Sequence, residues 1–368
     1  MMKKVCLVCL LLIISVTFVF GQALIGQLPS PRVVKNRPLK VVFMAPNVKS
    51  ESTQRNYRQF QIECAYRGWE LIEAIPVPHE QASSMTRSLI AKNPDAIANC
   101  YTYFDSWLNE VRMARNKGIG VYAIDTEIKP GVIVSPRQFD GAAGAKIMAH
   151  MVDRIGYKGD VAIMWWHRHE GVDRRTVCAE TIAKWYERKG VKLVSIYDIS
   201  TIDFDVEGFN AASAWASKYG KSLKAVFCGF DTPALFAANA FMSKGYTSSD
   251  IILGGIDGGT QALAAIRDPR NPFKVTLSQP FELYAHMTCE IIDKVQVQGM
   301  SIEAALKSVG ADPSIGNVIL EGRLISPENV PPKGSTYYEV HGFYGENPND
   351  PKAWINWWKK TDIEPYRS

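Results

Sequence analysis

The segment Leu39-Lys-Val-Val-Phe-Met-Ala45 is a nearly continuous apolar run, and it sets the expectation for the fold. A strand that is buried on both faces has such a run, whereas a strand with one solvated face alternates between apolar and polar residues. An amphipathic pattern follows from Thr53 to Arg67 and stops at Gly68. The segment therefore predicts the first strand of a parallel sheet that helices cover on both sides.

The same alternation of apolar runs and amphipathic segments continues along the chain, and it restarts near Val132. The expected strands are 39–45, 69–75, 95–100, 120–125, 132–135, 160–165, 192–197, 223–228, 251–256 and 273–277. The expected helices are 53–67, 81–92, 106–117, 141–155, 173–189, 207–219, 233–244, 260–266 and 281–298. Two consecutive sets of this kind predict an α/β fold of two similar doubly wound parallel-sheet lobes.

The N-terminus has the features of a secretory signal peptide. Met1-Met2-Lys3-Lys4 is basic, Val5 to Phe20 is uncharged and mostly apolar, and the small residues Gly21 and Ala23 follow. A membrane anchor is the alternative, but the run is shorter than the roughly 20 apolar residues of a spanning helix. We expect cleavage near Gly21–Ala23 and a periplasmic protein.

Composition and cysteine spacing exclude several classes of function. Lys and Arg number 42 against 37 Asp and Glu, an excess too small and scattered for nucleic-acid binding. Five cysteines follow the signal: Cys64, Cys100, Cys178, Cys228 and Cys289. Their odd number and wide spacing fit neither a disulfide framework nor a metal site. One disulfide remains open, and we expect no metal and no cofactor.

Polar residues follow many of the expected strands. In open parallel sheets, ligands bind beyond the carboxyl ends of the strands, so these residues are the candidates for a binding site. They include Ser50, Thr53, Thr102, Asp125, Asp231, Asp257 and Gln279. The competing interpretation is that Asp, Ser and Thr in such places cap the next helix.

Four longer segments carry a resemblance to a known family. They are Asp105-Ser-Trp-Leu-Asn-Glu-Val-Arg-Met-Ala-Arg-Asn-Lys-Gly-Ile-Gly-Val-Tyr-Ala-Ile-Asp125, Leu223-Lys-Ala-Val-Phe-Cys-Gly-Phe-Asp231, Gly254-Gly-Ile-Asp-Gly258 and Lys274-Val-Thr-Leu-Ser-Gln-Pro280. In their order and spacing, the chain resembles the periplasmic sugar-binding proteins of the ribose and galactose type, from about Lys40 to Asn329. The resemblance implies the type I periplasmic binding-protein fold, with two lobes joined by a three-segment hinge.

The resemblance also implies a ligand site. The family's pocket positions fall on Asp125, Arg174, Phe204, Asp231, Asp257 and Gln279. The chain departs from the family at Thr126, where an Arg is usual, and at Phe230, where an Asn is usual. At the first turn, Ser50-Glu-Ser-Thr53 stands in place of the family's Asn-Pro-Phe-Phe, so two ring-stacking aromatics are absent there. These departures leave the ligand's identity open.

The residue types suit a hydroxylated ligand. Carboxylates accept from sugar hydroxyls, an Arg donates through a planar fork, and a Gln does both. An aromatic ring such as that of Phe204 covers an apolar sugar face. The alternative for Arg174 is a structural ion pair with one of the aspartates.

The resemblance divides the chain into segments with separate roles. We expect a signal peptide at 1–23, a linker at 24–38, an N-terminal lobe of 39–134 plus 280–316, a C-terminal lobe of 135–279 plus 317–335, and an aromatic-rich tail at 336–368. The chain crosses between lobes near Ser135, Gln279 and Gly316, and ligand capture in the cleft closes this hinge.

The sequence thus predicts a monomeric solute-binding protein that delivers a monosaccharide or derivative to the permease of an ABC importer. The alternatives are a sensor subunit for a chemoreceptor or kinase, or a binder of a non-sugar polyol or signalling molecule. An enzyme is not expected, because the catalytic motifs Gly-x-Ser-x-Gly and His-Glu-x-x-His and a Walker phosphate loop are missing. His167-Arg-His169-Glu170 resembles a metal cluster, but a solvated loop is the favoured interpretation.

Overall fold

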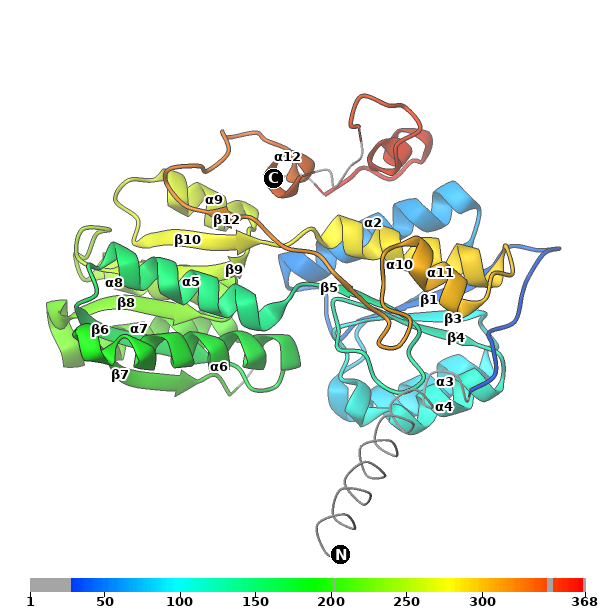
Figure 1. The fold of residues 1–368 in the computed structure, drawn as a ribbon, viewed down its shortest axis with the longest axis horizontal. Coiled ribbons are helices and arrows are strands. Elements are labelled where there is room, and N and C mark those ends of the chain that lie inside the picture. The colour runs from blue at the N-terminus through cyan, green and yellow to red at the C-terminus, as the bar shows by residue number, and fades with distance from the viewer. Residues whose placement is uncertain (1–27, 201–202, 343–346, 367–368) are drawn as a thin grey trace, which may run out of the picture. The chain divides into compact units, whose positions relative to one another are not determined.

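The computed structural model describes residues 28–200, 203–342 and 347–366 (Figure 1). The expected signal peptide at 1–23 and the start of the expected linker lie outside the described residues. The chain forms two compact units. The first unit contains the described residues up to Val48, together with Asn56–Arg137 and Glu282–Ile319. The second unit contains Lys49–Arg55, Gln138–Phe281 and the described residues from Leu320 onward.

The first unit is a parallel sheet with helices on both faces. Its strands lie in the order β2 (Glu70–Ala74), β1 (Lys40–Met44), β3 (Ala96–Cys100) and β4 (Gly120–Ile124). Val42 and Met44 of β1 pack with α3 (Ala82–Ala91) and α4 (Leu108–Asn116). Phe43 points to the other face, where its ring lies 5.2 Å from Phe60 of α2 (Glu51–Arg67). Alternate residues of one apolar strand thus enter two different cores.

The second unit is built in the same way around a larger sheet (Figure 1). The strand order is β12 (Leu324–Ile325), β10 (Phe273–Ser278), β9 (Ile252–Asp257), β8 (Leu223–Cys228), β6 (Gly159–Trp165) and β7 (Val191–Asp198). Only β12 is antiparallel to its neighbour among these described strands. One face is covered by α5 (Asp140–Arg154) and α6 (Glu170–Trp185). The other is covered by α7 (Phe204–Tyr219), α8 (Asp231–Ser243) and α9 (Thr260–Arg267).

Helices α5 and α6 touch each other through their backbones at Gly144. A Cβ atom at this glycine would lie 1.9 Å from the carbonyl oxygen of Arg175. Any side chain here would therefore push the helices apart. The contact fixes Arg175 on α6 relative to Asp140 at the start of α5.

Short elements complete the chain. A parallel pair joins β5 (Ser135–Arg137) to β11 (Asn317–Ile319), and α10 (Phe281–Gln296) and α11 (Ile302–Ser308) precede β11. The boundaries between the units fall at Arg137/Gln138, Phe281/Glu282 and Ile319/Leu320, with Lys49–Arg55 as a further short excursion.

The aromatic-rich tail belongs to the second unit by its contacts. It contains α12 (Tyr337–His341) and a 3₁₀ helix at Trp354–Lys360. Val340 packs in the core beneath α7, α8 and α9, and Trp354 and Ile355 are 5% and 3% exposed. These side chains contribute to packing of the unit.

The predicted fold class is confirmed: both units are α/β with parallel sheets. One strand was predicted wrongly, because β5 begins only at Ser135 instead of Val132. The residues before it still run along β4, where Ile133 N donates to Val121 O and Val134 O accepts from Ala123 N. Beyond the last expected helix, 281–298, the structure contains further short elements, among them α11 and the strands β11 and β12.

The described cysteines carry free thiols, and four of the five are buried, with Cys178 partly exposed. Within the described part of the chain, no helix combines the length and apolar character needed to cross a bilayer.

Candidate functional site

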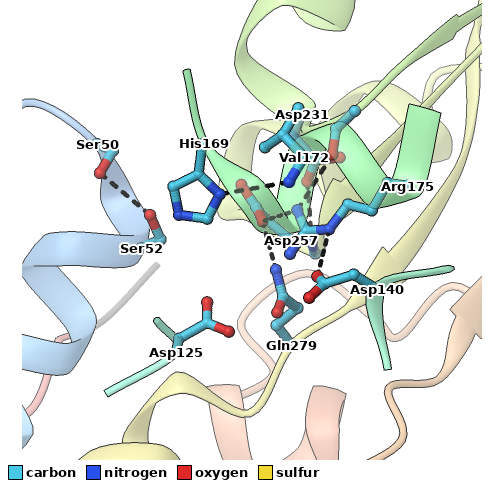
Figure 2. Close-up of polar contacts among 12 residues, drawn as sticks. Ser50, Ser52, Asp125, Asp140, His169, Val172, Arg175, Asp231, Asp257 and Gln279 are labelled. Atoms are coloured by element: carbon cyan, nitrogen blue, oxygen red, sulfur yellow. Dashed lines mark hydrogen bonds and ion pairs between the residues drawn. The ribbon is translucent and has the colours of Figure 1, made fainter. Parts of the chain in front are cut away.

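An arginine and two aspartates form the centre of the candidate site in the second unit (Figure 2). Arg175 Nε donates to Asp140 Oδ1 at 2.8 Å, and its Nη1 lies 4.0 Å from Asp257 Oδ1. Gln279 Nε2 donates to the same oxygen of Asp257 at 2.9 Å. Arg175 and Asp140 are buried, whereas the Asp257 side chain is 19% exposed. We call Arg175, Asp140, Asp257 and Gln279 the polar cluster.

Secondary structure places each member of the polar cluster. Asp257 ends β9, Gln279 directly follows β10, and Asp140 begins α5. Arg175 lies one turn into α6, whose N-terminus is capped by His169: its Nδ1 accepts from Val172 N at 3.3 Å. Arg175 Nη1 also donates to Gly229 O at 3.1 Å, just after β8. The cluster thus lies at the carboxyl ends of adjacent parallel strands, where ligands bind in such sheets.

The arginine beside Asp257 is Arg175, and the ligand contact expected of its neighbour Arg174 remains a prediction. Adjacent residues on a helix point about 100° apart, so only one of the two arginines can face the sheet edge. Arg175 is 3% exposed and takes this position, whereas Arg174 is half-buried on the neighbouring side of α6. An ion pair of this kind is made by Arg175, with Asp140 as the closer partner, whereas the alternative stated above concerned Arg174.

Asp231 supports the loop after β9 with both of its carboxylate oxygens. Oδ2 accepts from Gly258 N at 2.9 Å and from Gly259 N at 3.1 Å, and Oδ1 accepts from Thr276 Oγ1 at 2.7 Å. Asp231 is only 4% exposed. Its observed role is therefore to hold the loop that follows Asp257, and the ligand contact predicted for it remains a prediction.

Burial changes the acidity of the two neighbouring carboxyl groups. It raises the pKa of Asp231 above the ordinary aspartate value, against the opposing effect of the hydrogen bonds from Thr276 and Gly259. Burial also raises the pKa of Asp257, and the nearby Asp231 carboxylate raises it further, while Arg175 opposes the shift. Two acids this close resist ionising together.

We predict that Asp231→Asn flattens the dependence of stability on pH. The raised pKa means that the folded protein holds a proton that the unfolded chain has lost above about pH 4. Wild-type stability should therefore fall as the pH rises from that value through the folded pKa, and the neutral amide should remove this part of the slope. Chemical denaturation between pH 4 and 8 measures the effect, with the exposed Asp362→Asn as the matched control.

Asp231→Ala should instead destabilise the protein at every pH. It leaves the amides of Gly258 and Gly259 and the Thr276 hydroxyl without their carboxylate acceptor. An unsatisfied buried donor costs about 1–3 kcal/mol, so the loss should exceed that of Asp231→Asn by at least this much. Equal stability of the two variants would contradict the supporting role of Asp231.

Phe204 lies in a group of aromatic rings of the second unit. Its ring centroid is 4.9 Å from Trp166 and 4.8 Å from Phe230, and Trp166 and Phe230 are 5.9 Å apart. Trp166 follows β6, Phe230 follows β8, and Phe204 begins α7. We call these three residues the aromatic corner.

In the first unit, Asp125 follows β4 and pairs with a tyrosine. Tyr101 Oη donates to Asp125 Oδ2 at 2.8 Å, and Asn56 Nδ2 donates to Tyr101 Oη at 3.3 Å. Thr126 is turned toward the backbone, where its Oγ1 accepts from Tyr101 N at 2.7 Å. Asp125 is thus held at the carboxyl end of the first unit's sheet.

Other predicted residues have structural hydrogen bonds. Ser50 Oγ accepts from Thr53 N at 3.2 Å and thereby caps the start of α2. Ser50 Oγ also lies 2.8 Å from Thr53 Oγ1. Thr102 is fully buried, and its Oγ1 donates to Val77 O at 3.4 Å. Ligand contacts by these three residues remain predictions.

A backbone conformation that is rare outside glycine occurs at three candidate residues, two in the first unit and one in the polar cluster. Tyr101, Asp125 and Asp257 have φ angles of 70°, 48° and 143°. A residue in such a conformation costs about 1–3 kcal/mol, and strain of this kind concentrates at functional sites. The conformation of Asp125 and Asp257 thus supports their assignment to ligand recognition.

The histidine cluster has structural partners. His167 Nδ1 lies 3.0 Å from Asp173 Oδ1, and His169 caps α6. No group of three or more His, Cys, Asp or Glu in the described ranges is arranged to hold a metal ion.

Several residues of the site were missed by the sequence analysis. Asp140 lies several residues after the expected strand 132–135 and directly before the expected helix 141–155, and it was not among the selected residues. Tyr101 and Trp166 also follow strands directly, but the sequence analysis did not select them as site residues. Asp140 and Arg175 pair between two helices, and this contact leaves no local signal in the sequence.

Comparison with known proteins places most of the chain in one family. A family model described as "periplasmic binding protein domain" matches residues 42–296. The matched range includes Asp125, Arg175, Asp257 and Gln279.

Individual relatives bind sugars and related molecules. The chain is 29% identical over 194 residues to the xylitol-binding protein of Mycolicibacterium smegmatis, which covers 50% of this chain and 52% of that protein. It is 25% identical over 228 residues to the ribose import binding protein RbsB of Bacillus subtilis, covering 61% and 70%. The chain thus spans about half the length of the xylitol-binding protein.

A solved structure agrees with the fold. The crystal structure of an ABC transporter solute-binding protein from Agrobacterium vitis, with bound allitol, superposes with a TM-score of 0.66 at 18% identity. The superposition covers 79% of this chain and 96% of that chain. At this identity the likeness shows the fold alone.

Proposed function

The chain belongs to the periplasmic binding protein family, and from this premise we propose that it captures a sugar or polyol and delivers it to an ABC importer. The observation that carries the proposal is the polar cluster at the carboxyl ends of the second unit's strands. This cluster brings together the partly exposed carboxylate of Asp257, the guanidinium of Arg175 and the carboxamide of Gln279.

The chemistry of the polar cluster fits neighbouring hydroxyl groups. Asp257 accepts hydrogen bonds, Arg175 donates them, and Gln279 does both, so hydroxyls that donate and accept at once can be satisfied in pairs. Asp125 with Tyr101 offers the same combination of acceptor and donor in the first unit. Bonds to the charged groups are the stronger ones.

The relatives support a hydroxylated ligand of either ring or chain form. These proteins are named for xylitol or ribose or contain bound allitol, which are two linear polyols and one sugar. All three present adjacent hydroxyls on a carbon chain. We therefore propose this shared chemistry for the ligand of the present chain.

In this proposal the protein binds and releases its ligand without changing it. A ligand that contacts residues of both units favours a closed form, because it stabilises that form more than the open one. The permease of the importer then distinguishes loaded from empty protein. The same premise supports a location outside the cytoplasm, with export by the expected signal peptide.

A thermal-shift panel of pentoses, hexoses, linear polyols and inositols tests the proposal. A ligand that binds only the native state must raise the melting temperature in a concentration-dependent way. We expect a rise with at least one sugar or polyol, and no turnover of that compound by chromatography. Nucleosides and amino acids serve as negative classes. A cooperative melt that none of the sugars or polyols shifts would contradict the proposal.

A further inference from the structure

The aromatic corner presents only carbon atoms of its side chains to its surroundings. Trp166, Phe204 and Phe230 are all partly exposed. The phenyl rings contain no polar atom, and the indole Nε1 of Trp166 is buried and has no hydrogen-bond partner among the described residues. A ligand group in contact with these three rings therefore meets no accessible hydrogen-bonding atom on the rings themselves.

The rings form walls and not a flat platform. The planes of Trp166 and Phe204 meet at 77°, and those of Phe204 and Phe230 meet at 88°. Stacking on a sugar face requires one open ring face. Rings that stand perpendicular to one another instead surround a compact group from more than one side.

The aromatic corner is connected to the polar cluster through neighbouring backbone positions and hydrogen bonds of the second unit. Phe230 lies between Gly229, whose carbonyl accepts from Arg175, and Asp231, whose carboxylate accepts from Gly258 N beside Asp257. The ring of Trp166 is stacked at 5.9 Å on His169, which caps the helix that carries Arg175. A single small molecule can thus be matched to polar groups and apolar walls at fixed positions.

We propose that the ligand is a sugar or polyol that carries a small apolar group, such as a methyl in place of a hydroxyl or on a hydroxyl oxygen, and that Phe230 selects for it. The inference rests on the proposed function and narrows its ligand class. An unmodified hydroxyl in the corner would lose its water and gain no partner there. A methyl group at the same place gains contact with the rings and loses little.

Matched pairs of compounds test this by titration calorimetry. The pairs are D-ribose with 5-deoxy-D-ribose, D-galactose with D-fucose, and myo-inositol with an O-methyl-inositol. For the pair that binds, the modified member should bind at least about tenfold more tightly than its parent. Phe230→Asn should reduce this ratio to near one by weakening the modified member. Phe230→Leu, which keeps a carbon surface, should preserve most of the ratio.

Phe209→Asn is the matched control, because Phe209 is a phenylalanine on α7 that is 38% exposed and lies outside the corner. It should leave the ratio unchanged, and ligand-free melts should show that all variants fold. A parent compound that binds as tightly as its modified partner overturns the inference and leaves the proposed function standing, as does an equal loss of both members in Phe230→Asn. Absence of binding by every compound of the pairs and of the thermal-shift panel to cooperatively melting protein overturns both.

Discussion

Replacing Arg175 with alanine is expected to lower the free energy of unfolding by about 3–5 kcal/mol and to abolish ligand binding. The stability loss follows because Asp140, with its side chain only 2% exposed, would keep a buried charge without its guanidinium. The binding loss follows because the donor beside Asp257 disappears. Denaturant unfolding and titration calorimetry with the compound identified by the panel measure the two effects.

A second variant separates binding from stability. Arg175→Met combined with Asp140→Asn removes both charges of the buried pair and should recover much of the stability, since no uncompensated charge remains. Binding should stay lost. Arg174→Ala is the matched control: it should change stability by less than about 1 kcal/mol and leave binding intact. Loss of binding in Arg174→Ala but not in the double variant would instead support the ligand contact predicted for Arg174.

Asp257→Asn is expected to weaken ligand binding by about 10- to 100-fold, because a hydrogen bond to a charged group contributes about 1.5–3 kcal/mol. The amide is nearly isosteric and can still interact with Gln279, so the fold should be retained. The exposed Asp362→Asn is the control for the chemical change. Calorimetry at fixed pH gives the affinities.

The same variant should remove a pH dependence of binding. Burial and the neighbouring Asp231 raise the pKa of Asp257, so part of the free protein carries a proton on this carboxyl group near neutral pH. A ligand whose hydroxyls donate to the carboxylate favours the ionised form and lowers that pKa. Affinity should therefore rise with pH and reach a plateau above the pKa of the free protein. Binding should also release a proton.

Proton release can be measured directly. Calorimetry in two buffers of different ionisation enthalpy should give different observed heats for the wild type and equal heats for Asp257→Asn. If the wild-type heats are also equal, Asp257 is already ionised in the free protein. The affinity would then show no rise with pH.

The fold could be predicted from the sequence because buried parallel strands leave an unambiguous pattern. The runs Leu39–Ala45 and Leu223–Cys228 are apolar on both faces, and the structure contains β1 and β8 at these places. The region near Val132 was harder. Residues 132–134 are as buried as a strand, but they lie beside β4 without becoming a regular strand until Ser135.

The site was predictable only to the level of strand ends. Asp125, Asp257 and Gln279 were selected by that rule, and the structure places the last two in direct contact. The choice between Arg174 and Arg175 depends on the rotation of α6, which the backbone contact at Gly144 fixes. That contact joins residues far apart in sequence and leaves no local signal.

The rule also cannot distinguish a ligand contact from loop support. Asp231 and Ser50 follow strands as Asp257 does, yet their side chains bond to nearby backbone amides. A polar residue at the end of a strand is present whether its side chain supports a loop or faces a ligand. Only the direction of the side chain, which packing decides, separates the two roles.

Tyr101, Asp125 and Asp257 have positive φ angles, so thermal stability and ligand binding favour different residues at these three positions. Glycine would adopt these backbone conformations without strain, but it would delete a hydroxyl and two carboxylates from the sites. A library of variants selected for heat resistance alone should therefore accumulate glycine at these positions and lose the ligand. Selection for ligand capture retains the strained residues, so this chain carries at three positions a local instability that its proposed task explains.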